Sequence, residues 1–484
     1  MKNITQLIKS LSPREVKLFK RYYAIGPKSE SNLKNKLFDI ILNHDLLGDE
    51  DAARLISKKD DNSFKMIKQR LEQDILKFLL WEHDPIDTMS KAVKARGTCR
   101  LLMIQVEILM SKGLYTIADQ KLLKAERLAR KYDLTQDSIL IKEFMARSVV
   151  LTGGAKFYKK FKDSALEDFR IIKEKFDAQD HYRKLTRPIQ FIAAKKLNYI
   201  EQARISVEQL KELSERNNSL DIKTWYLKSQ TYYNHLIDNY KESKRHLLEE
   251  LELANSNPKL FPSDSWGGIY SRLAIVSVYM GDFFETLEYV QLAEKYFYKE
   301  SNNHLRVLHC AFQAYLYMGD YDKARAVILK VKKFKIVKPG SFNYYNWLYY
   351  EAIVNFKIGD YKSTLNILQR NSDLTADKTG WRVGFKIVEM MCIIEMQNYD
   401  WLDYRIEAFR KLIKSIKNEN MSRATVIYEL IKKLVKENYN FKTTTEKLKE
   451  KLDLLNSDID EYRWEARGYE LIRFDEWWKG KLRK

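Results

Sequence analysis

Apolar residues recur at helical spacing through most of the chain. In residues 63–81, for example, Phe64, Ile67, Leu71 and Ile75 lie three or four positions apart, which places them on one face of a helix. Between such segments stand short turns that contain glycine, Asp or Asn. This pattern of helix and turn predicts an all-α fold.

Aromatic residues mark a regular repeat of these helical segments. An aromatic recurs at intervals of roughly 40 residues, a length typical of helical arrays in which each unit packs only against its neighbours. The nine positions are Tyr115, Phe161, Tyr199, Tyr240, Phe283, Tyr321, Tyr361, Tyr399 and Tyr439. The repeat favours a binding scaffold over an enzyme.

The residues just before each aromatic explain why one helix ends and the next begins. Three copies carry glycine and aspartate there: Gly281-Asp282-Phe283, Gly319-Asp320-Tyr321 and Gly359-Asp360-Tyr361. Glycine can adopt the left-handed conformation that ends a helix, and Asp can accept hydrogen bonds from the first amides of the next helix. Each copy therefore predicts two helices joined by a tight turn.

The residues after each aromatic also repeat at helical spacing. Small residues tend to follow at the third position and apolar residues at the seventh, as with Ala324 and Ile328 after Tyr321. These two positions share one helical face. After Phe161 and Tyr199 the same residue types come one position later, which one extra turn residue would explain.

The turn resembles that of the tetratricopeptide repeat family. The family's Gly-Asp-Tyr-x-x-Ala motif is matched fully by residues 319–324, loosely by 113–118 and partly by 281–286 and 359–364. The resemblance covers roughly residues 95–455, with a repeat longer than the family's length of about 34 residues and mostly without its closing proline. It implies a right-handed α-solenoid with a concave groove, built from longer helices than usual, and it implies no chemistry.

The first part of the chain carries no repeat. Residues 1–90 are predicted to form an N-terminal helical domain. Ser12-Pro13-Arg14-Glu15 has the form of a capping box, in which Ser and Glu satisfy each other's backbone amides at the start of a helix. Asp84-Pro85 marks the expected boundary before the repeat solenoid at residues 91–455.

The last part of the chain is rich in aromatic residues. A solenoid needs terminal caps over its exposed core, so residues 456–484 are expected to form a C-terminal capping helix. The alternative is that Trp477 and Trp478, together with the basic residues around them, contact a membrane surface or a nucleic acid.

Composition gives further limits on location. No stretch approaches the run of about 18 apolar residues that a membrane span requires, and the start of the chain lacks the apolar core of a secretion signal, which predicts a cytoplasmic protein. Three cysteines far apart indicate neither a disulfide framework nor a zinc site. The abundance of Lys, Asn, Ile and Tyr is typical of an AT-rich, bacterial genome.

No catalytic, metal or cofactor motif is present in convincing form. On a helix, His304 and His309 would point about 140° apart, and no third ligand accompanies them. Lys378-Thr379-Gly380 matches a tripeptide of penicillin-binding enzymes, but that class needs a sheet. Gly153-Gly154-Ala155-Lys156 lacks the spacing of a phosphate loop. We predict no catalysis, no metal and no cofactor.

In the family's geometry the first helix of each pair lines the groove, so its residues can be counted back from the turn aromatic. Positions 15, 12, 8 and 5 residues before the aromatic should share this face. The candidates for partner binding are Arg100, Lys184, Arg187, Trp225, Lys228, Tyr232, His235, Arg306, His309, Gln313, Asn346 and Tyr349. No acid is among them, which fits an acidic or extended peptide. Alternatively, Trp225, Tyr232 and Tyr349 pack between helices.

The chain is strongly basic, with a net charge of +20. Residues 1–90 hold 16 basic and 14 acidic side chains, so nearly all of the excess lies in the repeats. The densest basic run contains Lys323, Arg325, Lys330, Lys332, Lys333, Lys335 and Lys338 with no acid between them. Such a run attracts phosphate or an acidic partner; the alternative is a solvated outer surface.

These observations predict a cytoplasmic, non-enzymatic adaptor that binds a protein or peptide in a basic, aromatic groove. Two other functions stay open. The charge also suits a protein that binds RNA, DNA or a ribonucleoprotein such as the ribosome. A ligand-sensing regulator is the other, because some bacterial peptide-responsive regulators join a small helical domain to similar repeats. The sequence does not indicate the partner's identity or the oligomeric state.

Overall fold

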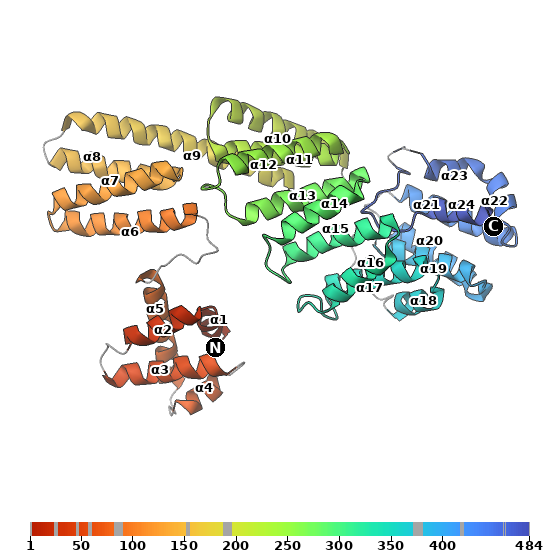
Figure 1. Ribbon diagram of the computed structural model, residues 1–484, viewed down its shortest axis with the longest axis horizontal. Helices are drawn as coiled ribbons and strands as arrows, with labels where there is room; N and C mark the ends of the chain where they lie inside the picture. The colour runs from red at the N-terminus through yellow and green to blue at the C-terminus, as the bar shows by residue number, and fades with distance from the viewer. Residues whose placement is uncertain are drawn as a thin grey trace. The chain divides into compact units, whose positions relative to one another are not determined.

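The computed structural model describes residues 2–23, 28–44, 48–56, 61–81, 91–151, 155–186, 196–370, 381–416, 421–457, 459 and 461–483. Within these residues the chain forms α-helices and short 3₁₀ helices and contains no strand (Figure 1). The predicted boundary at Asp84-Pro85, the glycines Gly153 and Gly154, the candidate Arg187 and the tripeptide at 378–380 lie outside the described residues.

The chain divides into two compact units, residues 1–89 and residues 90–484. The helices of the first unit are α1 (Lys2–Lys9), α2 (Pro13–Tyr23), α3 (Lys28–Asn43), α4 (Asp49–Leu55) and α5 (Asp61–Trp81). Its core centres on Phe19, whose ring lies 4.8 Å from that of Phe38 and 5.2 Å from that of Phe78, measured between centroids. The capping box at the start of α2 is confirmed: the Glu15 amide donates to Ser12 Oγ and the Ser12 amide donates to Glu15 Oε2.

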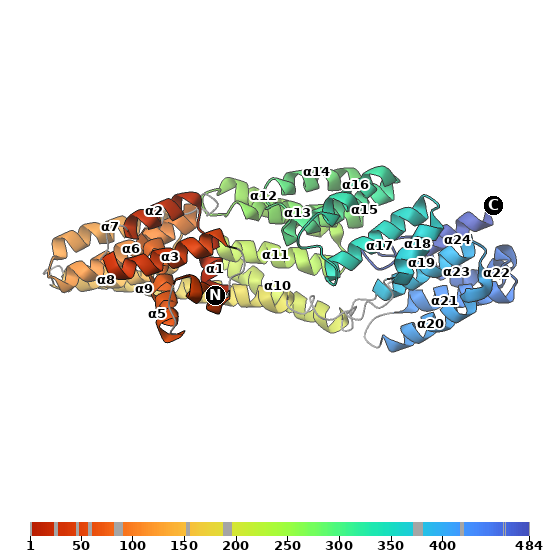
Figure 2. The same ribbon diagram turned by 90° about the horizontal axis from the view of Figure 1, so that it is seen from below.

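The second unit is a stack of helix pairs. Its helices are α6 (Lys91–Ser111), α7 (Tyr115–Lys131), α8 (Thr135–Leu151), α9 (Tyr158–Thr186), α10 (Lys196–Arg216), α11 (Leu220–Leu236), α12 (Tyr240–Ser256), α13 (Asp264–Met280), α14 (Phe283–Glu294), α15 (Asn302–Met318), α16 (Tyr321–Lys332), α17 (Phe342–Lys357), α18 (Tyr361–Arg370), α19 (Trp381–Glu395), α20 (Leu402–Ser415), α21 (Ser422–Lys436), α22 (Phe441–Lys447), α23 (Lys449–Leu455) and α24 (Phe474–Leu482), with 3₁₀ turns η1 (Ala155–Phe157) and η3 (Tyr399–Trp401). Figure 2 shows α14 and α16 along one side of the stack with α13 and α15 beside them.

The predicted turn chemistry is confirmed in the central repeats. Gly281, Gly319 and Gly359 have φ between 76° and 86°, the left-handed region that a side chain would strain. The next residue caps the following helix: Asp320, for example, accepts a hydrogen bond from the Lys323 amide at 3.2 Å. The turn aromatic is the first residue of α12, α14, α16 and α18. The solenoid therefore owes its repeat to local backbone chemistry.

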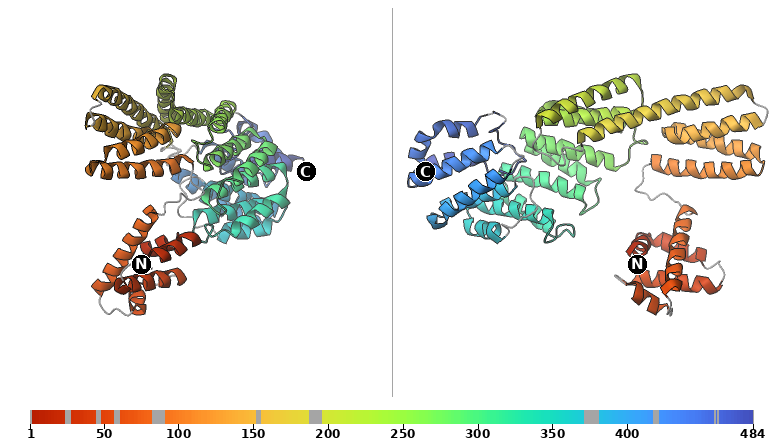
Figure 3. Two further views of the ribbon diagram at one scale, coloured as in Figure 1. Left: turned by 60° about the vertical axis from the view of Figure 1, so that its left-hand side comes forward. Right: turned by 180° about the vertical axis from the view of Figure 1, so that it is seen from behind.

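The long helix α9 lies between the turns of the two copies with the shifted register, those at Phe161 and Tyr199. Its first half packs on α8, with Lys142 Nζ 2.6 Å from Asp168 Oδ2, and its second half packs on α10 and α11 (Figure 3). One helix thus serves as the second member of one pair and the first member of the next. In α9 and α10 the aromatic is the fourth helical residue and helix continues after it, so the explanation by one extra turn residue is wrong.

The copy at Tyr439 was placed wrongly. Asn440, two residues after the predicted cap Asn438, accepts the hydrogen bond from the Thr443 amide, and α22 begins at Phe441. Tyr439 instead stacks on the preceding turn aromatic, Tyr399, with ring centroids 3.5 Å apart.

The end of the stack is covered by α24. Trp478 is completely buried, and its Nε1 donates to Thr445 Oγ1 at 2.9 Å, while Trp477 Nε1 donates to Glu395 Oε1 at 2.6 Å. Trp478 therefore packs inside the protein and Trp477 is half-buried, which agrees with the capping interpretation better than with a contact to a membrane or a nucleic acid. The helix is shorter than expected, because residues 461–473 before it contain no regular secondary structure.

Candidate interaction face

Residues 461–473, which we call the strap, lie across the first helices of the last repeats. Two of its carbonyl groups accept hydrogen bonds from side chains of these helices. Gln313 Nε2 (α15) donates to the Ala466 carbonyl at 3.2 Å, and the Tyr317 hydroxyl donates to the same oxygen. The Tyr349 hydroxyl (α17) donates to the Tyr469 carbonyl at 3.0 Å. The helices thus bind the backbone of an extended segment.

The strap also places a cation among neutral groups. The Arg467 guanidinium donates to Gln313 Oε1 at 2.7 Å and to Cys310 Sγ at 3.3 Å, and it lies 3.4 Å from His309 Nδ1. Its charge is therefore satisfied by dipoles and a thiol, with no carboxylate within ion-pair distance among the described residues.

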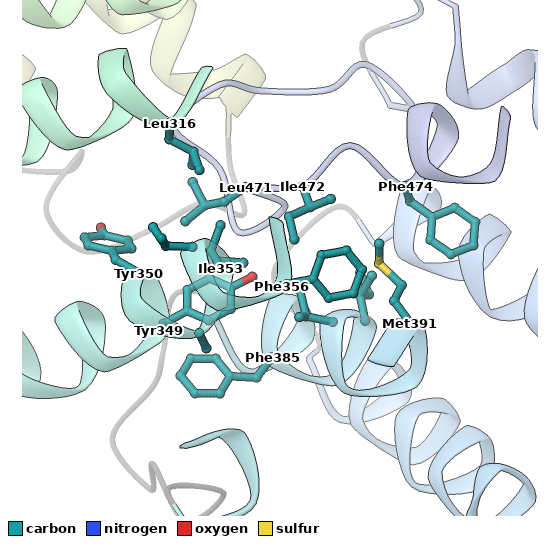
Figure 4. Packing of buried hydrophobic residues seen from close by; sticks show 14 of the residues in the cluster. Leu316, Tyr349, Tyr350, Ile353, Phe356, Phe385, Met391, Leu471, Ile472 and Phe474 are labelled. Atoms are coloured by element: carbon teal, nitrogen blue, oxygen red, sulfur yellow. The ribbon is translucent and has the colours of Figure 1, made fainter. Parts of the chain in front are cut away.

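Apolar side chains fix the second half of the strap. Leu471 and Ile472 are buried and lie beside Tyr349, Ile353 and Phe356 of α17 (Figure 4). The backbone comes very close to α19 at Gly384: a Cβ at that position would lie 2.1 Å from the Tyr469 carbonyl oxygen. A glycine is therefore required for this contact.

A buried charge network joins the strap to α21 and α24. Arg423 is about 5% exposed, and its Nε lies 2.6 Å from Glu470 Oε2 and its NH2 2.8 Å from Asp475 Oδ1. Its NH1 donates to the carbonyls of Leu455 and Tyr462 at 2.7 Å. One guanidinium thereby satisfies two buried carboxylates and two carbonyls.

Three residues that the sequence selected for partner binding, His309, Gln313 and Tyr349, thus contact the chain's own strap. His309 and Tyr349 stand twelve residues before their turn aromatics, and Gln313 stands eight before. We call the surface formed by the first helices at these positions the first-helix face. In the second half of this face, over α15 and α17, the bound segment is the strap, which contributes the cation Arg467. The sequence had favoured an acidic partner.

The neutral state of His309 gives a test by pH. Its pKa lies well below the usual value because the ring is desolvated and Arg467 lies beside it. The unfolded chain takes up this proton near pH 6.5, so stability should be complete above about pH 7.5 and should fall by up to about 1.4 kcal/mol per pH unit below about pH 6.5. His309→Gln should reduce this slope in urea titrations, whereas His44→Gln, at an exposed position of the first unit, should leave it. An unchanged slope in His309→Gln contradicts the assignment.

The first half of the first-helix face has no such occupant among the described residues. There Tyr182 of α9 lies 4.7 Å from Trp225 and 5.9 Å from Tyr232, between ring centroids, and Lys228 Nζ lies 4.9 Å from the Trp225 ring. A cavity of about 290 Å³ opens beside Trp225; it is also lined by Phe176, by the cations Arg96 and Lys175 and by three aspartates, Asp133, Asp137 and Asp221. Trp225 and Tyr232 also pack in part against the apolar clusters between these helices, so only part of each ring is open to a partner.

Two cations share one carboxylate behind these aromatic rings. Glu250 of α12 is 2% exposed; its Oε1 lies 2.8 Å from Arg272 NH2 and 4.0 Å from Lys228 Nζ, and its Oε2 has no hydrogen-bond partner in the structure. Desolvation and the nearby Arg272 lower the pKa of Lys228, against the attraction of Glu250. The group thus carries one positive charge in excess and is incompletely neutralised. Sequence reasoning missed Tyr182 and Arg272, because neither falls on the counted positions.

The other candidates lie apart from the strap. Arg100 is exposed and pairs with Asp137 at 3.1 Å, and Lys184 pairs with Asp180 on its own helix at 2.7 Å. The remaining three are His235, which packs edge-on against Tyr240 and Tyr279, the exposed Arg306, and the half-buried Asn346.

The predicted basic run is divided by its ion pairs. Lys323 pairs with Asp320, Lys330 with Glu294 and Lys332 with Glu351, while Arg325 donates to Asn355. The structure records no ion pair for the remaining three, Lys333, Lys335 and Lys338, with any residue that it describes.

No group of three or more His, Cys, Asp or Glu side chains suited to a metal ion occurs in the described part of the chain. Within the same residues, no helix is both long enough and apolar enough to cross a membrane.

No family model and no curated protein matches the chain. Among solved structures, it is similar to the apo form of RapI (12% identity, TM-score 0.47, 68% of this chain and 86% of that one). It is also similar to a signal-transduction ATPase with a tetratricopeptide repeat sensor from Pyrococcus horikoshii (13% identity, TM-score 0.40, 81% of this chain and 64% of that one). A third similar structure is the Cut9–Hcn1 hetero-tetramer of APC/C (11% identity, TM-score 0.35, 92% of this chain and 97% of that one). The fold is an α-solenoid of tetratricopeptide-like helix pairs. This assignment rests on the turns and helix pairing of the chain itself.

Proposed function

We propose that the protein is a non-enzymatic scaffold that binds an extended segment of a partner protein on the first half of the first-helix face, over α9, α11 and α13. The observation that carries this proposal is the strap. Residues 466–469 are bound through their backbone by side chains at the counted positions of α15 and α17. Lys228 and Tyr232 stand at the same positions of α11.

The chemistry of the open half favours an acidic segment. Lys228 and Arg272 share one carboxylate, so a carboxylate from the partner would complete their neutralisation. Tyr182, Trp225 and Tyr232 supply the large aromatic contact area that usually dominates binding energy. The expected ligand is an extended peptide in which Asp or Glu stands near an apolar or aromatic residue.

Selection from a library of displayed random twelve-residue peptides against the full chain tests this proposal. Enriched peptides should carry Asp or Glu beside an apolar residue, and Lys228→Glu should weaken them at least tenfold, about 1.4 kcal/mol, because it places two carboxylates against each other. Anisotropy of labelled peptides measures the affinity.

The matched control is Lys223→Glu, an exposed position on the same helix with the same change of charge. It should leave peptide affinity within about twofold, since surface charges contribute little. Failure to enrich any peptide, or an equal loss in both variants, would show that this face is not the binding site.

A further inference from the structure

Three successive turns, each joining one helix pair to the next, lie along one edge of the solenoid. They are residues 257–263 before α13, 295–301 before α15 and 333–341 before α17, and Figure 1 shows these three helices beginning on the same side. The turns are neighbours: the Lys335 amide donates to Glu300 Oε2 at 3.2 Å, and the Tyr296 ring stacks on Trp266 at the start of α13. We call residues 257–263, 295–301 and 333–342 the turn edge.

The turn edge carries a dense, unneutralised positive charge. Its three turns contain six lysines and one carboxylate, Glu300, which already accepts a hydrogen bond from the Lys335 amide. All six are exposed, and the structure records no ion pair for any of them with the residues it describes: Lys259, Lys295, Lys299, Lys333, Lys335 and Lys338. The charge therefore extends across three repeats, beyond the run visible in the sequence.

Aromatic side chains stand exposed among these lysines. Tyr298 is 71% exposed and Phe342 is 52% exposed. Tyr298 directly precedes Lys299, and Phe342 is the first residue of α17, four positions after Lys338. Rings exposed to this extent are available to stack on flat ligands.

We propose that the turn edge binds single-stranded nucleic acid. Lysines without carboxylate partners attract backbone phosphates, and exposed rings stack on unpaired bases, a combination that tolerates any sequence. The bases of a duplex are paired and cannot stack on the rings, so a duplex would gain only the attraction between its phosphates and the lysines. This inference is independent of peptide binding, because the turn edge and the first-helix face use different residues.

Anisotropy of a labelled 20-nucleotide oligouridine with the full chain tests the proposal. For single strands, the slope of log affinity against log salt concentration is about −0.7 per phosphate contacted. If all six lysines contact phosphates, raising the salt from about 50 to 200 mM should therefore weaken binding by roughly 10²-fold to 10³-fold. Lys333→Ala with Lys335→Ala should reduce the magnitude of that slope by about 1.4. Tyr298→Ala should weaken binding about tenfold and leave the slope unchanged, because stacking releases no counterions.

The control is Lys241→Ala with Lys362→Ala, which removes the same charge from exposed second residues of α12 and α18, where the opposite turns begin. It should leave affinity and slope unchanged. An equal loss in both double variants, tighter binding of the corresponding duplex, or binding of acidic phospholipid vesicles without binding of the oligonucleotide would each overturn the proposal. Thermal unfolding monitored by circular dichroism verifies that every variant is folded.

Discussion

Replacing Gly384 by alanine should release the strap from α17 and α19. The new methyl carbon would lie 2.1 Å from the Tyr469 carbonyl oxygen and 2.7 Å from the Tyr349 hydroxyl. The first of these is a backbone atom, which cannot move aside as a flexible side chain can. We expect a loss of about 3 kcal/mol in the free energy of unfolding, the upper end for overpacking of a core, and faster hydrogen exchange at the amides of residues 466–472.

Gly268→Ala is the matched control. Gly268 lies inside α13 and would bring its Cβ within 4 Å of no neighbouring atom. Alanine is the better helix former by up to about 1 kcal/mol, so this variant should be slightly more stable in urea unfolding. A Gly384→Ala protein with normal stability and normal exchange in the strap would contradict the close approach described for Tyr469.

Replacing Arg423 by methionine should be the most damaging change to a single charge. It leaves Glu470, which is 5% exposed, without its cation, while the completely buried Asp475 keeps only Arg473. Removing one partner of a buried pair usually costs about 3–5 kcal/mol. Urea unfolding at neutral pH should show a loss of this size.

A compensating variant separates charge from packing. Adding Glu470→Gln to Arg423→Met removes the unpaired carboxylate, while Asp475 keeps its pair with Arg473, and should recover most of the lost stability. Arg410→Met serves as the surface control, because Arg410 pairs with the half-exposed Glu407 three residues away and such pairs contribute less than about 1 kcal/mol. If the compensated protein stays as unstable as Arg423→Met alone, the guanidinium acts through its carbonyl contacts instead.

The turns could be predicted from sequence because their chemistry is local. The left-handed glycine at 319 and the capping Asp at 320 contact residues at most five positions away, so a short stretch of sequence contains the whole turn. The register of the first helices followed from counting back, so the sequence identified Gln313 and Tyr349 as residues of one face. Counting from the aromatics assigned the second helix of one pair and the first helix of the next as two separate helices. In the structure they form one long helix, α9.

The strap could not be predicted, because its partners are distant in sequence. Residues 461–473 were expected to be helical, and their extended conformation depends on Gln313, Tyr349 and Gly384, which are 85 to 153 positions away. The sequence did show an aromatic-rich end, in which Trp478 is completely buried. The basic run could be recognised because its lysines are close together in the sequence. Lys295 and Lys299 are distant from it in the sequence and lie near it only in the folded protein.

The strap also changes how the solenoid is expected to acquire its structure during synthesis. Helical repeats form from neighbouring contacts and can fold in order as the chain emerges. The hydrogen bond between Gln313 and Ala466, in contrast, joins residues 153 positions apart. Until residues 461–473 leave the ribosome, the polar groups of Gln313 and Tyr349 and the apolar surface of α17 and α19 stay uncovered. Nascent chains that stall within this interval should be the species most dependent on chaperones, and closure of the strap should be the last and slowest step of maturation.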